Sequence, residues 1–351
     1  MKTKRIIHCA NFNYIKHKGG YLHNAAYKIS QGLIRNGHNV LDFPDRDIKR
    51  CFSVFGMLKQ LGAKKFNDLF YDYCISSKPD GILLGHADTV ETATLAKIKK
   101  SLPDVKILQW NVDCIDNGFV SHNLQNIKSK LEVVDYTIIT TAQKDLLEQF
   151  GCKNVGFMPN PVDASIERGR AFEKEQNIYD LIFTAKKKSI RDLCGVSYSA
   201  EDFVARMLQN IDMNNVIVPG VLTAPVSGAK YQELMENSSM GLCVSQVNDN
   251  FLYSSDRMAH LMGNGVLIFL DRRTGFDKIF DDSEVAFYST EKELYEKINY
   301  FRNNPKERMK AAKAGWQKYH QLFNEKIVAE YITDLMFGGY DENKYPWAKF
   351  I

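Results

Sequence analysis

The chain has 351 residues, of which 44% are hydrophobic and 25% charged, and 46 basic against 42 acidic residues give a net charge of +4. The length predicts two domains that each have a core, and the balanced charge argues against nucleic acid while permitting an anionic ligand or a peripheral membrane contact. The seven cysteines form no CxxC pair, so we expect reduced thiols in a cytoplasmic protein, with neither disulfides nor a metal site. No apolar run approaches transmembrane length, and the N-terminus is typical of a first strand instead of a signal peptide.

The first half begins with the pattern of a βαβ unit. Residues 5–12 predict a strand, the loop NYIKHKGG ends in Gly19 and Gly20, residues 21–36 have helical periodicity, and HNVLDF at 38–43 predicts a second strand. The Gly pair followed by RNGHNV resembles the start of group 1 glycosyltransferases. In that family the pair lets backbone amides approach the donor phosphates, which implies this role for Gly19 and Gly20. The alternative is a plain strand–helix turn that needs small residues.

Polar side chains follow the next two predicted strands of this half. His86 and Asp88 follow a strand at 82–85, and Asp113 follows a strand at 105–112. Because ligands of doubly wound sheets gather at the carboxyl ends of strands, we expect these three side chains and Asp116, which lies outside the residues described below, to face one crevice. His86, Asp88 and Asp113 are the candidates for a general base or a carboxylate nucleophile, with Asp113 ranked first. The alternative for Asp88 is a cap of the following helix.

A domain boundary is predicted at MPNPVD, residues 158–163, because its two prolines end regular structure. The segment resembles the one that leaves the N-terminal domain in group 1 glycosyltransferases. We expect an N-terminal domain over 1–160, a C-terminal domain over 161–336, and a tail over 337–351 that packs back on a domain. Helices of the C-terminal segment that cross back to the first domain are the alternative. Helices that alternate with strands at 179–185, 215–221, 241–245, 266–270 and 284–289 predict a second parallel sheet.

Two basic features of the second half are candidate phosphate contacts. Lys186, Lys187 and Arg191 follow its first predicted strand, where similar group 1 enzymes carry an Arg and a Lys that hold the donor phosphates. A solvated charge run is the alternative. Arg257 lies in the first turn of a short predicted helix, 257–262, whose N-terminus offers free N–H groups to an anion.

The stretch YSSDRMAHLMGNGVLIF, residues 253–269, predicts a polar turn, that short helix, a Gly turn and a buried strand. With a later NPKER segment, this order resembles the CgeB-like branch of group 1 glycosyltransferases. The resemblance implies donor contacts from the turn and helix: Tyr253, Ser255, Asp256, Arg257 and His260. The family's acidic pair is absent, because Leu252 and His260 stand at its two positions. Ribose recognition and stereochemistry are therefore left open, and a structural role for His260 is the alternative.

Together these features resemble a GT-B glycosyltransferase, an α/β protein with two Rossmann-like parallel-sheet domains facing a cleft. The resemblance implies transfer of a sugar from a nucleotide-activated donor to a glycan or glycolipid, in surface polysaccharide or lipopolysaccharide synthesis. It implies no cofactor and no obligatory metal, and a cytoplasmic location that permits contact with the inner face of the membrane. Two alternatives are a transferase for a CMP-linked acidic sugar and a non-catalytic nucleotide- or sugar-binding protein of the same fold.

Overall fold

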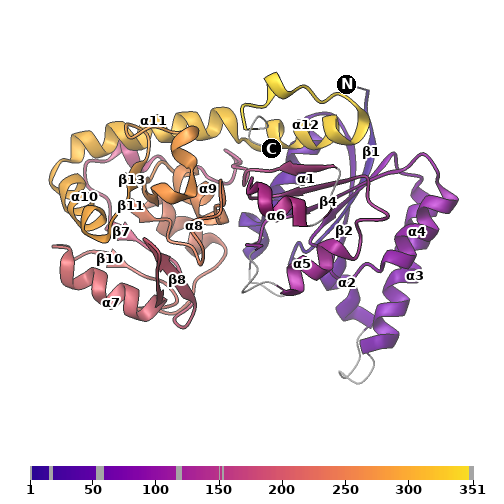
Figure 1. The fold of residues 1–351 in the computed structure, drawn as a ribbon, viewed down its shortest axis with the longest axis horizontal. Helices are drawn as coiled ribbons and strands as arrows, with labels where there is room; N and C mark the ends of the chain where they lie inside the picture. The colour runs from indigo at the N-terminus through magenta and orange to yellow at the C-terminus, as the bar shows by residue number, and fades with distance from the viewer. Residues whose placement is uncertain are drawn as a thin grey trace. The chain divides into compact units, whose positions relative to one another are not determined.

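The computed structural model describes residues 2–15, 19–52, 59–115, 121–149, 151 and 154–347. The chain divides into two compact units (Figure 1). Unit 1 contains Met1–Ile139, Lys144–Met158 and Glu325–Ile351, and unit 2 contains Thr140–Gln143 and Pro159–Asn324. The C-terminal residues therefore return to the unit that contains the N-terminus.

Unit 1 is built on a parallel β-sheet. Its strands are β1 (Arg5–Ala10), β2 (Asn39–Pro44), β3 (Gly81–Gly85), β4 (Lys106–Asn111), β5 (Tyr136–Ile139) and β6 (Val155–Phe157). They lie in the order β2-β1-β3-β4-β5-β6, so the chain first winds from β1 to β2 at one edge and then turns back to add β3 to β6 on the other side of β1. Every residue of β3 is buried, as expected of a strand covered on both faces.

Helices pack around this sheet. They are η1 (Gly20–His23), α1 (Ala25–Arg35), α2 (Asp45–Phe52), α3 (Lys59–Ser77), α4 (Thr92–Ser101), α5 (Ser121–Lys128), α6 (Lys144–Gln149), α12 (Glu325–Phe337) and η5 (Glu342–Lys344). Helix α12, drawn in yellow, lies against α1 (Figure 1). The approach is close at Gly32, where an added Cβ would lie 2.0 Å from the carbonyl oxygen of Glu325. Arg35 Nη1 also pairs with the Glu325 carboxylate at 2.6 Å.

Unit 2 is built on a second parallel sheet with a small antiparallel hairpin beside it. The sheet strands are β7 (Tyr179–Ile182), β10 (Val216–Ile217), β11 (Ser238–Leu242), β12 (Leu267–Asp271) and β13 (Ala286–Tyr288), and the hairpin strands are β8 (Ile190–Leu193) and β9 (Val196–Ser199). The sheet order is β10-β7-β11-β12-β13. Two separate parallel sheets confirm the predicted Rossmann-like α/β class.

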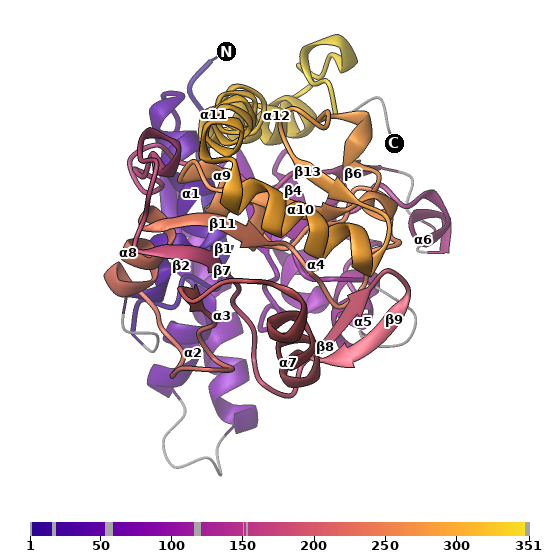
Figure 2. The same cartoon turned by 90° about the vertical axis from the view of Figure 1, so that its left-hand side faces the viewer.

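The helices of unit 2 follow its strands in alternation. They are η2 (Ala171–Glu173), α7 (Ala200–Asn210), α8 (Ala229–Glu236), α9 (Asp256–Gly263), η3 (Arg272–Thr274), η4 (Phe276–Lys278), α10 (Glu291–Asn303) and α11 (Pro305–Leu322). Helix α7 lies beside the hairpin β8–β9 (Figure 2). Pro305 is the first residue of α11, a position where the missing N–H costs no helical hydrogen bond.

The turn after α9 leads into β12, an interior strand of the sheet. Gly265 has a φ of +72°, in the left-handed region that favours glycine. The N–H of Gly265 reaches the carbonyl of Met262 at 3.0 Å, and that of Val266 reaches the carbonyl of Leu261 at 3.1 Å. These two bonds make a Schellman motif, which ends the helix and satisfies its last carbonyls. The predicted order of helix, Gly turn and buried strand is confirmed.

Some boundaries differ from those that the sequence predicted. The strand expected at 241–245 is β11, which begins at Ser238. Its two serines are polar but buried, and the Ser238 hydroxyl is satisfied by donating to the Leu234 carbonyl at 2.7 Å. Residues 325–336 were expected in the C-terminal domain but form α12 in unit 1, because α12 packs on α1, where its buried residue Ala329 lies against Gly32. Strand β6, helix α5 and the hairpin β8–β9 were not predicted.

Candidate active site

Two arginine side chains of unit 2 converge on one aromatic ring. Phe183 follows β7, Arg191 lies on β8, and Arg257 lies in the first turn of α9. The guanidinium carbon of Arg257 lies 5.3 Å from the centroid of the Phe183 ring, and that of Arg191 lies 5.9 Å from it. Both distances are those of cation–π contacts. Two of the predicted donor-binding residues, distant in sequence, are therefore neighbours in the structure.

Arg257 is held by neutral oxygen atoms only. Its Nε donates to Thr184 Oγ1 at 3.2 Å, and its Nη1 donates to the Val244 carbonyl at 3.3 Å and to Ser255 Oγ at 3.2 Å. No Asp or Glu among the described residues forms an ion pair with it. Ser255 is the N-cap residue of α9, so the guanidinium lies at the positive end of the helix. The positive charge of Arg257 therefore has no direct carboxylate partner among the described residues.

Arg191 is buried, with 6% of its surface exposed. Its Nη1 donates to the Ile190 carbonyl at 2.6 Å, and its Nε is buried without a hydrogen-bond partner. Burial, and next the neighbouring Arg257, lower the pKa of Arg191 to about 10. The group stays charged at neutral pH, but the protein around it disfavours that charge. An unpaired buried cation of this kind is the environment that a bound anion would complete.

The remaining predicted donor-binding residues of unit 2 differ in their surroundings. Lys186 is exposed after β7, and the exposed Lys187 pairs with Glu201 at 2.8 Å, as a surface lysine does. Tyr253 is buried, and Asp256 is exposed in the first turn of α9. The structure therefore brings Ser255, Asp256 and Arg257 together at one helix end.

His260 is a buried residue of α9, with 4% of its surface exposed. Its Nδ1 lies 2.9 Å from the hydroxyl of Tyr231 in α8, and the two rings meet edge to face. This contact ties α9 to α8 and fits the structural alternative for His260. Tyr231 itself was not singled out by the sequence, where nothing marks it as the partner of a histidine 29 residues away.

Unit 1 places His86 beside Asp113 at the carboxyl ends of β3 and β4. His86 Nδ1 lies 3.6 Å from Asp113 Oδ2, and the Asp113 side chain is exposed. Burial lowers the pKa of His86 below its ordinary value, and the Asp113 carboxylate opposes that shift. A neutral imidazole beside an exposed carboxylate is an arrangement that can accept a proton from a hydroxyl group. The predicted convergence of these two residues is therefore observed.

The backbone at His86 is held in an uncommon conformation. His86 has a φ of +56° and Ala87 a φ of +35°, although neither is glycine. Asn126 Nδ2 donates to the His86 carbonyl at 2.5 Å, and the buried Lys130 donates through Nζ to Asn126 Oδ1. Strained backbone that is fixed by its surroundings is concentrated at functional sites. Asn126 and Lys130 support this turn, and no local sequence signal identified them.

Asp88 does not cap the following helix. Helix α4 begins after Glu91, and Asp88 instead receives two hydrogen bonds from Arg46, at 3.2 Å from Nε and 3.1 Å from Nη2. The charge of the Asp88 carboxylate is therefore neutralised by Arg46, whereas the Asp113 carboxylate is exposed.

The glycine pair predicted to approach the donor phosphates lies before α1. Gly19 has a φ of +86°, a backbone conformation that favours glycine, and Gly20 begins η1. Both glycines lie in unit 1.

Residues 202–334 match the family model described as glycosyl transferase-like. The chain carries a glycosyl transferase-like domain. This domain includes Arg257 and the whole of α9, and it begins in α7, shortly after Arg191. Among curated proteins, none matches the sequence significantly.

Solved structures extend the similarity over the fold of the whole chain. One is Anabaena Alr3699/HepE in complex with UDP and glucose, with a TM-score of 0.62 and 12% identity over 94% of this chain and 98% of the other. The catalytic domain of starch synthase IV from Arabidopsis thaliana, bound to ADP and acarbose, has a TM-score of 0.59 and 10% identity over 95% and 99%. AviGT4, a glycosyltransferase involved in avilamycin A biosynthesis, has a TM-score of 0.55 and 10% identity over 95% and 97%.

The solved structures confirm the predicted GT-B fold. The family match confirms a glycosyl transferase-like domain over residues 202–334. Assignment to the CgeB-like branch stays a prediction, as do the roles of the individual site residues. None of the helices in the described part of the chain is long and apolar enough to span a membrane. Within the same residues, no group of three or more His, Cys, Asp or Glu side chains is placed to hold a metal ion.

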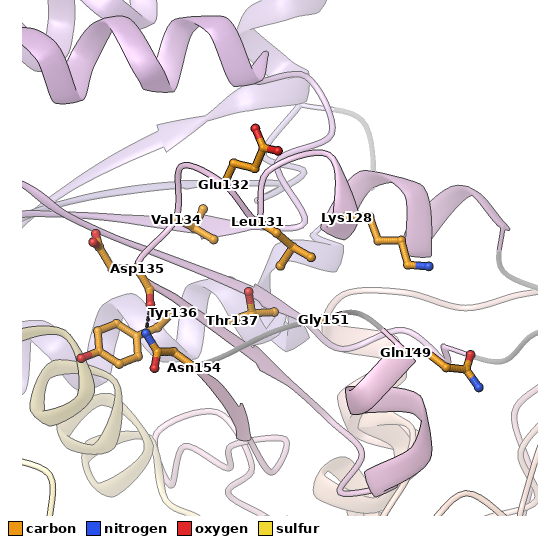
Figure 3. Close-up of a pocket in the computed structure, with 10 residues that line it drawn as sticks. All are labelled: Lys128, Leu131, Glu132, Val134, Asp135, Tyr136, Thr137, Gln149, Gly151 and Asn154. Carbon is orange, nitrogen blue, oxygen red and sulfur yellow. Dashed lines mark hydrogen bonds between the residues drawn. The ribbon is translucent and has the colours of Figure 1, made fainter.

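A depression of about 780 Å³ lies in another part of unit 1 (Figure 3). Its lining includes Asp135 and Tyr136 at the start of β5 and Asn154 just before β6, and Asn154 Nδ2 donates to the Asp135 carbonyl at 3.0 Å. These residues mark the amino ends of the strands, opposite the ends that carry His86 and Asp113. None of the predicted site residues lines this depression, so it is separate from the candidate site.

Proposed function

We propose that the protein transfers a sugar from a nucleotide-activated donor to a glycan or glycolipid acceptor. The observation that carries this proposal is the pair Arg191 and Arg257, two cations on one ring with no carboxylate partner among the described residues. The donor diphosphate is the anion that fits such a pair, because its two phosphate groups spread negative charge over several oxygens. The UDP and ADP bound by proteins of similar fold support this donor class.

In the proposed reaction the donor phosphates bind in unit 2 between the guanidinium groups and the N-terminus of α9. The bond between the anomeric carbon and the phosphate oxygen breaks, and negative charge develops on the leaving diphosphate. Preorganised cations and N–H groups stabilise that charge in the transition state. Because Arg191 and Arg257 supply this charge, the proposal requires no metal ion and no cofactor.

The acceptor hydroxyl must lose its proton as its oxygen bonds to the anomeric carbon. We assign Asp113 as the group that takes the proton, with His86 beside it as the second proton acceptor. Asp88 is a weaker candidate, because Arg46 already donates to both of its oxygens. The resemblance to group 1 enzymes supports a surface polysaccharide or lipopolysaccharide as the product, formed in the cytoplasm or at the inner face of the membrane.

A binding and turnover screen tests the proposal. The protein is titrated with UDP-, GDP-, ADP- and dTDP-sugars and with CMP-linked acidic sugars, and nucleotide release is then measured with glycan and glycolipid acceptors. We expect a nucleoside diphosphate sugar to bind and to release its nucleotide. Binding of CMP-linked sugars alone would favour the acidic-sugar alternative. Nucleotide binding without release under any acceptor condition would favour a non-catalytic binding protein, and no binding at all would refute the proposal.

A further inference from the structure

The strand that carries Arg191 belongs to a hairpin with little sheet of its own. Strands β8 and β9 pair only with each other in the described part of the chain, and a two-stranded hairpin is marginally stable by itself. Arg191 also faces Arg257, and the two like charges repel each other. Without other contacts, β8 would move away and separate the two guanidinium groups. Something must therefore hold β8 in place.

The next residue on the strand, Asp192, provides the attachment. Successive side chains of a strand point to opposite faces, so Asp192 faces away from Arg191. The Asp192 N–H donates to the Ser245 carbonyl at 2.9 Å, and Asn248 Nδ2 donates to the Asp192 carbonyl at 2.6 Å. Asn248 is fully buried, and its own Oδ1 accepts the Ser245 N–H at 3.3 Å. These bonds fasten β8 to the segment that follows β11.

The same segment fixes the second arginine. Val244, which directly precedes Ser245, accepts the hydrogen bond from Arg257 Nη1. The backbone at 244–245 therefore contacts both Arg257 and the strand that carries Arg191. Because one short piece of chain contacts both, a shift of β8 relative to it would change the distance between the two cations.

A third arginine, Arg273, binds the carboxylate of Asp192. Arg273 Nη2 donates to Asp192 Oδ1 at 2.8 Å and to Asp271 Oδ2 at 2.7 Å, and the Gly195 N–H donates to the same Asp192 Oδ1 at 2.7 Å. Asp271 is fully buried at the end of β12. The carboxylate of Asp192 thus joins the hairpin turn to the end of a central strand. Its hydrogen bonds are charge-assisted and short.

We propose that Asp192, Asn248 and Arg273 are positioning residues for the anion site: they hold β8 against the 244–245 backbone so that Arg191 and Arg257 face one ligand. This inference rests on the proposed function, in which that ligand is the donor diphosphate. None of the three is assigned a contact with the donor. They act by fixing where Arg191 lies before the donor arrives, which lowers the cost of ordering the site on binding.

The test is a double-mutant cycle measured by calorimetry with UDP, using Asn248→Ala, Arg191→Met and the double variant. Asn248→Ala removes the side-chain bonds to the Asp192 carbonyl and to the Ser245 N–H, and it keeps the bond from the Asn248 N–H to Asp192 Oδ2. We expect it to weaken UDP binding about tenfold, the equivalent of one charge-assisted bond. In the Arg191→Met background the same change should have no further effect, because the group that it positions is gone. Losses that multiply in the double variant, or an unchanged affinity in Asn248→Ala, would overturn the inference.

Asn237→Ala is the matched control, since Asn237 Nδ2 also donates to a backbone carbonyl, that of Glu233 at 2.8 Å, but lies at the end of α8. We expect it to leave UDP affinity unchanged. A crystal structure of Asn248→Ala separates this inference from the proposed function, because it needs no nucleotide. A displaced Arg191 side chain would support the inference even if the wild-type protein bound no nucleoside diphosphate. An Arg191 that stays on Phe183 would overturn it.

Discussion

Replacing Arg191 by methionine should weaken donor binding without weakening the fold. Methionine fills much of the volume of the buried stem but carries no charge. In the wild type, Arg191 is 6% exposed, its Nε has no partner, and its pKa is lowered to about 10 by burial and by Arg257. Because the folded state disfavours the charged form, this cost is present at every pH below about 10. At neutral pH the full cost therefore lowers the stability of the folded state.

The two effects can be estimated separately. A fall from 12.5 to about 10 in pKa corresponds to roughly 3 kcal/mol against the charged group. Losing the cation–π contact with Phe183 offsets about 1 kcal/mol of that, so the variant should be as stable as wild type or up to about 2 kcal/mol more stable. A hydrogen bond to a charged group contributes about 1.5–3 kcal/mol, so UDP affinity should fall by roughly 10- to 150-fold.

Calorimetric titration with UDP and denaturant unfolding of the same samples measure both quantities. A lower free energy of unfolding together with unchanged UDP affinity would refute the reasoning, because Arg191 would then be a structural residue. If Arg191 were only structural, its replacement would lower the free energy of unfolding and leave UDP affinity unchanged.

Four other outcomes follow from the geometry. Asp113→Asn should slow sugar transfer at least ~100-fold while UDP affinity changes little, and Asp88→Asn should slow it less, which initial rates and titrations would show together. Arg257→Met should weaken UDP binding at least about tenfold, and Lys187→Ala clearly less, because Lys187 is exposed and already paired. EDTA should leave the transfer rate within about twofold of the untreated enzyme, since the arginines supply the positive charge. His8 is fully buried, and burial lowers its pKa from 6.5 to about 3. As the pH falls below 6.5 the unfolded state takes up a proton at His8 before the folded state does, so the free energy of unfolding should fall by roughly 1.4 kcal/mol per pH unit. The variant His8→Leu should lose this dependence on pH.

The arrangement of strands was predictable because buried parallel strands are continuous apolar runs. Residues 82–85 and 266–270 each had the length and composition of such a strand, and each lies within one residue of its predicted place. The prediction of Arg257 as an anion contact rested on its place in the first turn of a helix, which is a local property. Its position in α9 is observed, while its binding role stays a prediction.

Pairings between distant residues could not be predicted. The segment KKKSIRDLCGVSYS contains the hairpin β8–β9, but its basic residues gave it the composition of a solvated charge run. Its strands form because Asp192 is bonded to Asn248 and Arg273, which lie 56 and 81 residues away. For the same reason the pairing of Asp88 with Arg46 was missed and a helix cap was considered instead.

The sequence could not decide which unit contains α12, and the reason is one of packing. Its sequence, EKIVAEYITDLMF, has an amphipathic pattern that fits a helix in either unit. What decides its place is the small surface at Gly32 of α1, where the chain of α12 approaches closely, and the ion pair from Arg35 to Glu325. A glycine within a helix is a weak signal in a single sequence.

A crystal structure of the protein with UDP tests the central claim most directly. The account predicts that the two phosphates lie within hydrogen-bond distance of Arg191 and Arg257, and that Arg191 Nε gains its missing partner. A nucleotide bound with its phosphates away from both guanidinium groups would contradict the account.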